Sequence, residues 1–208
     1  DGKLIFWGGL TLAAENEGVG LFDMELAAFE RLGGTIRYNA GMDALLTEGG
    51  AVVGVRLSNG EDIKAKSNIL ACGGFEANEG MRAGIIGEEW SHARTRGTPM
   101  NRGDGLRLAW ELGAQKYWRM NGCHATPMDL YMKPYANLGI PHGERKNYRK
   151  ISYFLGVMLN AQGQRFVDEG FDFRNYTYAQ FGGAVLRQPG QKAWQIFDAK
   201  RHELLYAE

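Results

Sequence analysis

Residues 69–75 read ILACGGF. The mainly apolar run over residues 68–71 predicts a buried strand, and the two glycines after Cys72 predict its end. Because glycine lacks a Cβ, the backbone at Gly73 and Gly74 can approach a ligand closely. Open α/β sheets bind ligands at the carboxyl ends of their strands, so this stretch predicts a ligand-contacting edge. An ordinary exit from a strand into a loop is the alternative.

The segments before this stretch predict one helix and several strands. Apolar residues at helical spacing predict a helix over residues 21–32, and Gly33-Gly34 predict its end. Asn59-Gly60 predicts a two-residue hairpin turn. Strands are expected over residues 35–38, 42–46, 51–57 and 61–65. Together these elements predict half of an α/β nucleotide-binding domain.

A second set of elements is expected after the ILACGGF stretch. The predicted helices cover residues 78–83, 104–112, 174–186 and a segment from 199 onward. The predicted strands are 151–160 and 164–167, which form a hairpin around Gln162-Gly163, and 193–197. From about residue 119, Tyr, Met, Asn and Pro become frequent. This change predicts a boundary near Tyr117, with domains over 1–117 and 118–208.

The composition is that of an ordinary globular protein. Of 208 residues, 44% are hydrophobic and 23% are charged, and 24 Lys and Arg balance 24 Asp and Glu. A formal charge of zero argues against nucleic-acid binding through bulk charge. The 30 glycines are about twice the average share of roughly 7%, and they fall at the edges of periodic segments. This placement favours turns and ligand loops.

Neither a disulfide framework nor a metal site is indicated. The two cysteines and four histidines show no metal-ligand spacing. No stretch resembles a signal peptide or is apolar enough to span a bilayer, so a cytoplasmic protein is expected. The chain lacks an initiator Met and stops within a periodic pattern, which predicts a fragment of a longer protein.

Three motifs carry candidate functional side chains. Gly103-Asp104-Gly105 places a carboxylate at a helix start, where it caps the helix or contacts hydroxyl groups of a ligand. CHATP, at residues 123–127, presents His124 in a loop stiffened by proline. RFVDEGFDFRNY, at residues 165–176, presents Arg174, whose fork of donors suits a carboxylate. For this last motif, capping by Asp172 and surface ion pairs are the structural alternative.

Other signature loops are incomplete. Gly18-x-Gly20 and Gly103-x-Gly105 both lack the third glycine of a dinucleotide fingerprint, so neither is a principal pyrophosphate loop. There is no P-loop lysine and no Gly-x-Ser-x-Gly nucleophile elbow. The basic loop at residues 145–150 contains Tyr148 and is either a solvated surface or an anion contact.

Together, these motifs resemble the flavoprotein subunits of the fumarate reductase and succinate dehydrogenase family. The resemblance spans nearly the whole chain and is closest to the branch that oxidises tricarballylate. It is carried by FWGGL at 6–10, ILACGGFEAN at 69–78, RGTPMNRGDG at 96–105, CHATP at 123–127, RFVDEGFDFRNYTYA at 165–179 and QPGQKAWQIFD at 188–198.

The resemblance implies a fold and a cofactor. The family has a Rossmann-like FAD-binding domain with an α/β capping domain inserted in it. We therefore expect an α/β chain that holds the middle portion of the FAD-binding domain, including its β-meander, and part of an α+β cap. The positions that the resemblance puts near FAD are Met42, Ala71, Gly73, Gly74 and Asp104.

The same resemblance implies a catalytic pair. His124 matches a substrate-binding histidine, and Arg174 matches the arginine that moves a proton to or from the substrate carbon. The spacing from Arg165 to Arg174 is one residue longer than in fumarate reductases. Their Thr-Glu-x-x-Arg motif is not recognisable here, which argues against fumarate. Tyr148 and Arg149 are the remaining candidates for contacts to substrate carboxylates.

The implied reaction is desaturation of a di- or tricarboxylate, with tricarballylate to cis-aconitate as the leading case. Arginine is a poor free base, so Arg174 would need a proton relay. The carboxylates nearby in sequence are Asp168, Glu169 and Asp172. The alternatives are a ketosteroid or cobalamin-pathway oxidation on the same scaffold, and a non-catalytic α/β ligand-binding module.

The expected partners are a small carboxylate, the missing parts of the protein's own chain and an unidentified electron acceptor. Without the pyrophosphate loop, the fragment is expected to be inactive and not to retain FAD. Apolar surface left open by truncation predicts self-association.

Overall fold

The structure is a computed structural model that describes residues 14–117 and 119–205. It divides into two compact units. The meander unit consists of residues 14–73 and Gly103–Lys116, and the α4 unit consists of Gly74–Arg102, Tyr117 and residues 119–205. The FWGGL motif lies outside the described residues. The boundary expected at residues 117 and 118 concerns function and remains a prediction.

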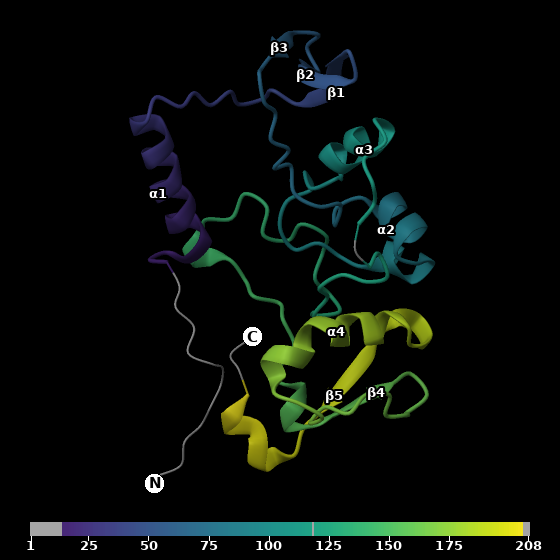
Figure 1. Cartoon of the computed structure of the whole chain (residues 1–208). Coiled ribbons are helices and arrows are strands. Elements are labelled where there is room, and N and C mark those ends of the chain that lie inside the picture. The colour runs from purple at the N-terminus through teal and green to yellow at the C-terminus, as the bar shows by residue number, and fades with distance from the viewer. Residues whose placement is uncertain (1–13, 118, 206–208) are drawn as a thin grey trace. The chain divides into compact units, whose positions relative to one another are not determined.

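A three-stranded antiparallel sheet gives the meander unit its name (Figure 1). The strands β1 (Met42–Glu48), β2 (Ala51–Leu57) and β3 (Asp62–Lys64) pair in sequence order, as predicted. Gly49 and Gly50 have φ angles of 57° and 82°, the backbone that a tight primed turn requires.

The second hairpin is one residue longer than Asn59-Gly60 predicted. Leu57 and Glu61 close a three-residue loop, in which the Leu57 N–H donates to the Glu61 carbonyl at 2.8 Å. Only Gly60, at φ 87°, adopts the left-handed region, whereas a type I′ turn needs two such residues. The loop therefore takes the three-residue form with a left-handed last position.

Two predicted helices belong to this unit. The helix α1 (Glu17–Arg31) begins earlier than predicted and ends as predicted, where the Gly34 N–H donates to the Phe29 carbonyl at 2.9 Å. The helix α3 (Asp104–Glu111) lies against β1 and buries Leu108. Its N-cap is Gly103, so Asp104 is the first helical residue and not the side-chain cap.

Two strands predicted for this unit do not form. Residues 35–38 and 68–71 have no strand structure, and Ile69 is 91% exposed. A strand needs a neighbour to take its backbone hydrogen bonds. In the described part of the meander unit, only β1, β2 and β3 pair with one another. The prediction of a buried strand before Gly73 is therefore wrong for this structure.

The α4 unit is built on a helix that lies across a strand pair (Figure 1). The strands β4 (Val157–Asn160) and β5 (Ala193–Ile196) are antiparallel, and α4 (Arg174–Leu186) has the predicted bounds. The core between them contains Ile151, Tyr153, Met158 and Phe181.

The hairpin predicted around Gln162-Gly163 forms only in part. The Asn160 N–H donates to the Gln164 carbonyl at 2.9 Å, but beyond this turn the returning chain makes a single bridge, between Leu159 and Arg165. The full partner of β4 is β5, because that strand offers a continuous edge. The chain ends its described part in a 3₁₀ helix, Ala199–Leu204, rather than an α-helix.

A buried arginine organises the loop after α2 (Glu79–Ile85). Asn78 caps this predicted helix by accepting from the Met81 N–H at 3.1 Å. Arg82, only 6% exposed, donates to four backbone carbonyls. These carbonyls belong to Glu76, Trp90, Ser91 and Ala93. The loop, which includes the 3₁₀ helix Glu88–His92, is therefore ordered around one guanidinium group.

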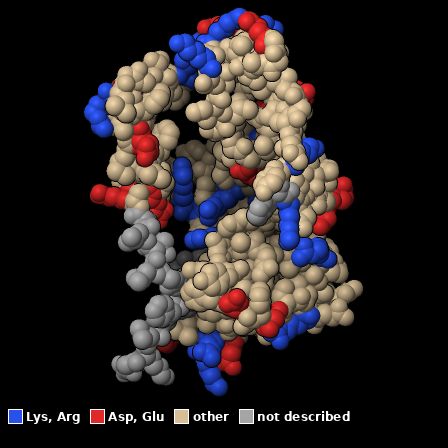
Figure 2. All heavy atoms as spheres, in the orientation of Figure 1, with Lys and Arg blue, Asp and Glu red and all other residues tan. Residues whose placement is uncertain are grey.

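Both signs of charge are dispersed over the visible surface, in keeping with the balanced composition (Figure 2). Over residues 14–117 and 119–205, no helix combines the length and the apolar character needed to cross a membrane. Three further 3₁₀ helices complete the structure: His142–Glu144, Tyr153–Leu155 and Pro189–Gln191.

Candidate functional site: the start of helix α4

The CHATP segment is hydrogen-bonded to the backbone of helix α4. The Ala125 N–H donates to the Ala179 carbonyl at 2.7 Å, and the Gly182 N–H donates to the Ala125 carbonyl at 3.0 Å. These two bonds tie Ala125 to neighbouring turns of the helix. His124, the residue before it, is thereby held next to α4.

The close approach depends on glycine within the helix. A Cβ on Gly182 would lie 2.5 Å from the carbonyl carbon of Ala125, closer than real contacts allow. At the next position, a Cβ on Gly183 would lie 3.3 Å from the ring of Trp90. A glycine pair is unfavourable inside a helix, so its presence is explained by the chain and the ring that pack against it.

The structure brings His124 and Arg174 to the same helix. The exposed His124 ring meets the Tyr178 ring edge-on, with 5.1 Å between centroids and 71° between planes. Tyr178 follows Arg174 by four residues, and residues at this spacing lie on one face of a helix. The two candidate catalytic side chains thus lie one helical turn apart.

A buried hydroxyl pair anchors the first turn of α4. Tyr153 and Thr177 are both fully buried, and their oxygens are 2.7 Å apart. The Thr177 hydroxyl also donates to the Arg174 carbonyl at 3.3 Å. Burial raises the pKa of Tyr153, while its bond to Thr177 and the charge of Arg174 oppose that rise. The backbone of Arg174 is therefore fixed from the core side.

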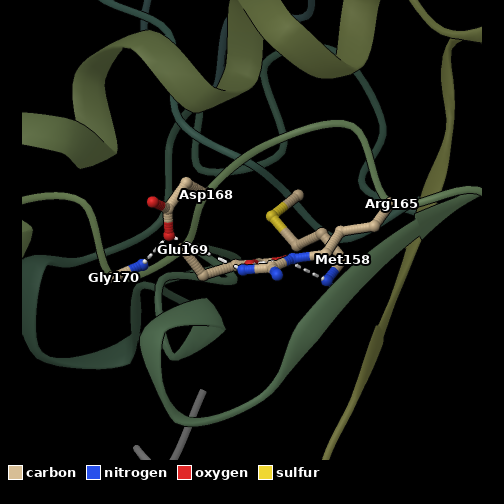
Figure 3. Close-up of polar contacts among 5 residues, drawn as sticks. All are labelled: Met158, Arg165, Asp168, Glu169 and Gly170. Atoms are coloured by element: carbon tan, nitrogen blue, oxygen red, sulfur yellow. Dashed lines mark hydrogen bonds and ion pairs between the residues drawn. The ribbon is translucent and has the colours of Figure 1, made fainter.

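The carboxylates suggested for a relay have other partners (Figure 3). Glu169 is 3% exposed and accepts from the Met158 N–H at 2.5 Å and from the Arg165 Nε at 2.8 Å. Asp168 accepts from the Gly170 N–H at 3.1 Å. Asp172 accepts from the Phe173 N–H, one residue before the helix, and is not the N-cap. Glu169 thus joins β4 to the following loop, which is a structural role.

Tyr148 and Arg149 lie on a different edge of the same unit. Arg149 forms a bridge with Met128, and the Lys150 N–H donates to the Pro127 carbonyl at 2.9 Å. Tyr148 has a φ of 56° and its carbonyl accepts from the Asp129 N–H. This segment therefore runs beside the continuation of CHATP.

The residues expected near FAD lie mostly in the meander unit. A Cβ on Gly105 would lie 3.0 Å from the Cys72 sulfur, so glycine is needed where the ILACGGF stretch passes the start of α3. Ala71 and Gly73 are exposed there, and no side chain caps the helix. Open backbone next to an uncapped helix start fits the phosphate and hydroxyl groups of a nucleotide such as FAD.

The other two positions are less directly placed. Met42 opens β1, the strand against which α3 packs. Gly74 falls in the α4 unit and is described with it. In residues 14–117 and 119–205, no three His, Cys, Asp or Glu side chains gather into a group that could hold a metal ion.

Comparison with known proteins decides the family. The family model for the FAD binding domain matches residues 11–205. The chain belongs to this FAD-binding family. FAD is accordingly the cofactor of the family, as predicted.

Three similar proteins share the length of the chain. It is 30% identical to a 3-oxosteroid 1-dehydrogenase of Mycobacterium tuberculosis over 188 residues, which cover 82% of this chain and 31% of that protein. It is 31% identical to the probable fumarate reductase Ifc3 of Shewanella frigidimarina over 150 residues, covering 72% and 22%. The fold is similar to a 3-ketosteroid-Δ4-(5α)-dehydrogenase from Rhodococcus jostii RHA1, with a TM-score of 0.63, 21% identity, and coverage of 90% and 35%.

These relatives support the flavoprotein family that the motifs resembled, and the expected α/β fold with part of an FAD-binding domain. They do not single out the tricarballylate branch. The chain spans about a third of the length of the first relative that it matches. The FAD-binding family therefore gives the chain its fold and its cofactor, while the substrate needs further argument.

Proposed function

We propose that the protein containing this chain is an FAD-dependent dehydrogenase that desaturates a small carboxylate, with tricarballylate as its substrate. The observation that carries the proposal is the placement of His124 and Arg174 one turn apart on α4. Bound FAD would accept the hydride, and the protein would supply position and charge.

The roles follow from how each side chain is held. The guanidinium of Arg174 offers a rigid fork of donors to a substrate carboxylate and lies where a proton can be moved at the neighbouring carbon. Tyr153 and Thr177 fix its backbone from below. His124 is positioned by Ala125 and offers a ring nitrogen to the same substrate. In this scheme Ala71, Gly73 and Asp104 contact FAD, with Met42 and Gly74 at the margins.

A second candidate is oxidation of a 3-oxosteroid. It is favoured by the 30% identity to a 3-oxosteroid 1-dehydrogenase. A neutral steroid, however, gives an arginine at the start of α4 no carboxylate to bind. For this reason we prefer the anionic substrate.

The compartment and the second partner complete the proposal. Cys72 and Cys123 are free and exposed thiols, which suits a reducing compartment such as the cytoplasm. The electron acceptor is a partner that neither residue set identifies.

Anaerobic reduction of the flavin in the full-length protein tests the substrate. We expect tricarballylate to bleach the flavin absorbance, and succinate and 4-androstene-3,17-dione to leave it unchanged. Bleaching by the steroid alone would overturn the first candidate in favour of the second.

Substitution of Arg174 tests the assignment of the site. Arg174→Lys keeps the charge but loses the planar fork, and we expect kcat to fall by about 100-fold or more, as for the loss of a proton-transfer group. Arg107→Lys is the matched control, because Arg107 lies on the exposed face of α3 in an ion pair with Glu111. Unchanged turnover in Arg174→Lys would contradict the role.

A further inference from the structure

Asn147 gathers two arginines from distant parts of the α4 unit. Arg96 Nη1 donates to the Asn147 backbone carbonyl at 2.8 Å and to its side-chain Oδ1 at 3.0 Å. Arg149 Nε donates to the same Oδ1. Two positive groups therefore share one neutral oxygen atom. Arg145 lies in the same basic loop, with its Nε bonded to the Ile140 carbonyl at 2.9 Å.

The surrounding backbone holds this arrangement in place. The Asn137 N–H donates to the Arg96 carbonyl at 3.2 Å, and the Asn137 side-chain amide donates to the Lys146 carbonyl at 2.8 Å. Arg149 is fixed by its bridge to Met128. The arginines are thus brought together by three chain segments rather than by chance contacts of long side chains.

The cluster lacks a negative partner among the described residues. No described carboxylate forms an ion pair with Arg96, Arg145 or Arg149. Their bonds go only to neutral oxygens, and most of their guanidinium donors have no acceptor in the described part of the chain. Burial, followed by the charges of Arg149 and Arg145, lowers the pKa of Arg96. Like charges held together in this way favour a bound anion.

We propose that Arg96, Arg145 and Arg149 form an oxyanion site that binds a carboxylate group of the substrate. This inference rests on the proposed function and extends it. Guanidinium groups match the two oxygens of a carboxylate. Met128, opposite Arg149, follows His124 by four residues, so their Cα atoms lie within roughly 14 Å even if the chain is fully extended. A polycarboxylate can then contact this site and the start of α4 together, since arginine side chains extend toward it.

The test is equilibrium binding of tricarballylate to the full-length enzyme after its flavin has been reduced with dithionite. A reduced flavin accepts no hydride, so binding is measured without turnover. We expect Arg149→Gln and Arg145→Gln each to weaken tricarballylate binding by about tenfold or more, and Arg107→Gln to leave it unchanged. Equal affinity in the parent and both cluster variants would overturn the site.

Two readouts guard the interpretation. A phosphate group of FAD is the other oxyanion that such a cluster could take, so the flavin content of each purified variant is measured. Unchanged flavin content with weakened tricarballylate binding supports the carboxylate site, whereas loss of flavin overturns it. Binding through this cluster without bleaching of the oxidised flavin would sustain the site and reject the proposed reaction. Arg145→Gln removes one exposed side chain with a single hydrogen bond, so its thermal midpoint should match that of the parent.

Discussion

The helices α1 and α4 were predicted by the same kind of local signal, yet they differ in what they bury. None of the 15 residues of α1 is buried, and Phe22 and Leu32 are 60% and 85% exposed. In α4, Thr177, Phe181, Gly182 and Gly183 are buried against β4, the CHATP segment and Trp90. Helical spacing and end signals therefore determine that a helix forms, whereas the partner surface determines what it contributes to stability.

The same contrast separates two short apolar segments. Residues 157–160 form β4 because β5 supplies a paired edge, and Met158 is 1% exposed. Residues 68–71 are as apolar but have no such neighbour in the described part of the meander unit, and Ile69 lies open. An apolar run predicts burial only where a second segment is available to pair with it.

The largest expected difference between the two regions is in their aromatic side chains. Phe181→Ala removes a ring that is 3% exposed and packs 4.5 Å from the Tyr153 ring, so we expect about 3–5 kcal/mol less free energy of unfolding. Phe22→Ala in α1 should change it by no more than about 0.5 kcal/mol. Urea denaturation of both variants measures this. Similar losses from the two would break the comparison.

Glycine substitution should have opposite signs in the two helices. Gly182→Ala places a Cβ against Ala125 and should cost about 1–3 kcal/mol through overpacking. Gly18→Ala in α1 meets nothing within 4 Å, so it should stabilise by up to about 1 kcal/mol through helix propensity. Thermal unfolding compares them. The contact between the His124 and Tyr178 rings, observed by NMR, should be lost only in Gly182→Ala.

Removal of a tyrosine hydroxyl should matter only in the α4 unit. Tyr153→Phe leaves Thr177 without its 2.7 Å partner and should cost about 1 kcal/mol, whereas Tyr38→Phe, at a site 71% exposed, should cost nothing measurable. The folded pKa of Tyr153 lies above its ordinary value of 10.0, so its contribution is complete below that pH and is lost as the pH rises through the folded pKa. Denaturation midpoints between pH 8 and about 11 test this sign, and the Phe variant should lack the decline due to Tyr153.

The smallest effect is expected at the surface of the meander unit. Hydrogen bonds from Arg37, at 2.9 and 2.7 Å, lower the pKa of the Glu61 carboxyl below its usual value. Any stability from this pair is therefore present above the unfolded pKa of Glu61 and is lost as the pH falls through the folded one. Arg37→Gln should raise the pKa in an NMR titration. A measurable fall in the denaturation midpoint at neutral pH would show that this exposed pair matters more than we infer.

Local elements were largely predictable. The bounds of α4 and the turn at Gly49-Gly50 follow from periodicity and turn residues, because both depend on neighbours in sequence. The failed strands at 35–38 and 68–71 depended on partners that no local pattern specifies.

The candidate site divides in the same way. Arg174 and His124 could be selected from their motifs, but 50 residues separate them, and their common position on α4 depends on Gly182 accepting Ala125. The approach of Arg96 to Arg149 has no sequence signal beyond two arginine-rich segments, since it is made by Asn147. Long-range polar contacts of this kind become visible only in the folded chain.

The carbonyl oxygens that converge on Arg82 resemble the oxygen cages with which many proteins hold calcium. Here the cation is covalently attached to the chain and comes from the helix that the loop follows. The shape of this loop should consequently be indifferent to chelators and to divalent ions. It is also inherited whole: a single codon change at position 82 would release the loop at four places at once.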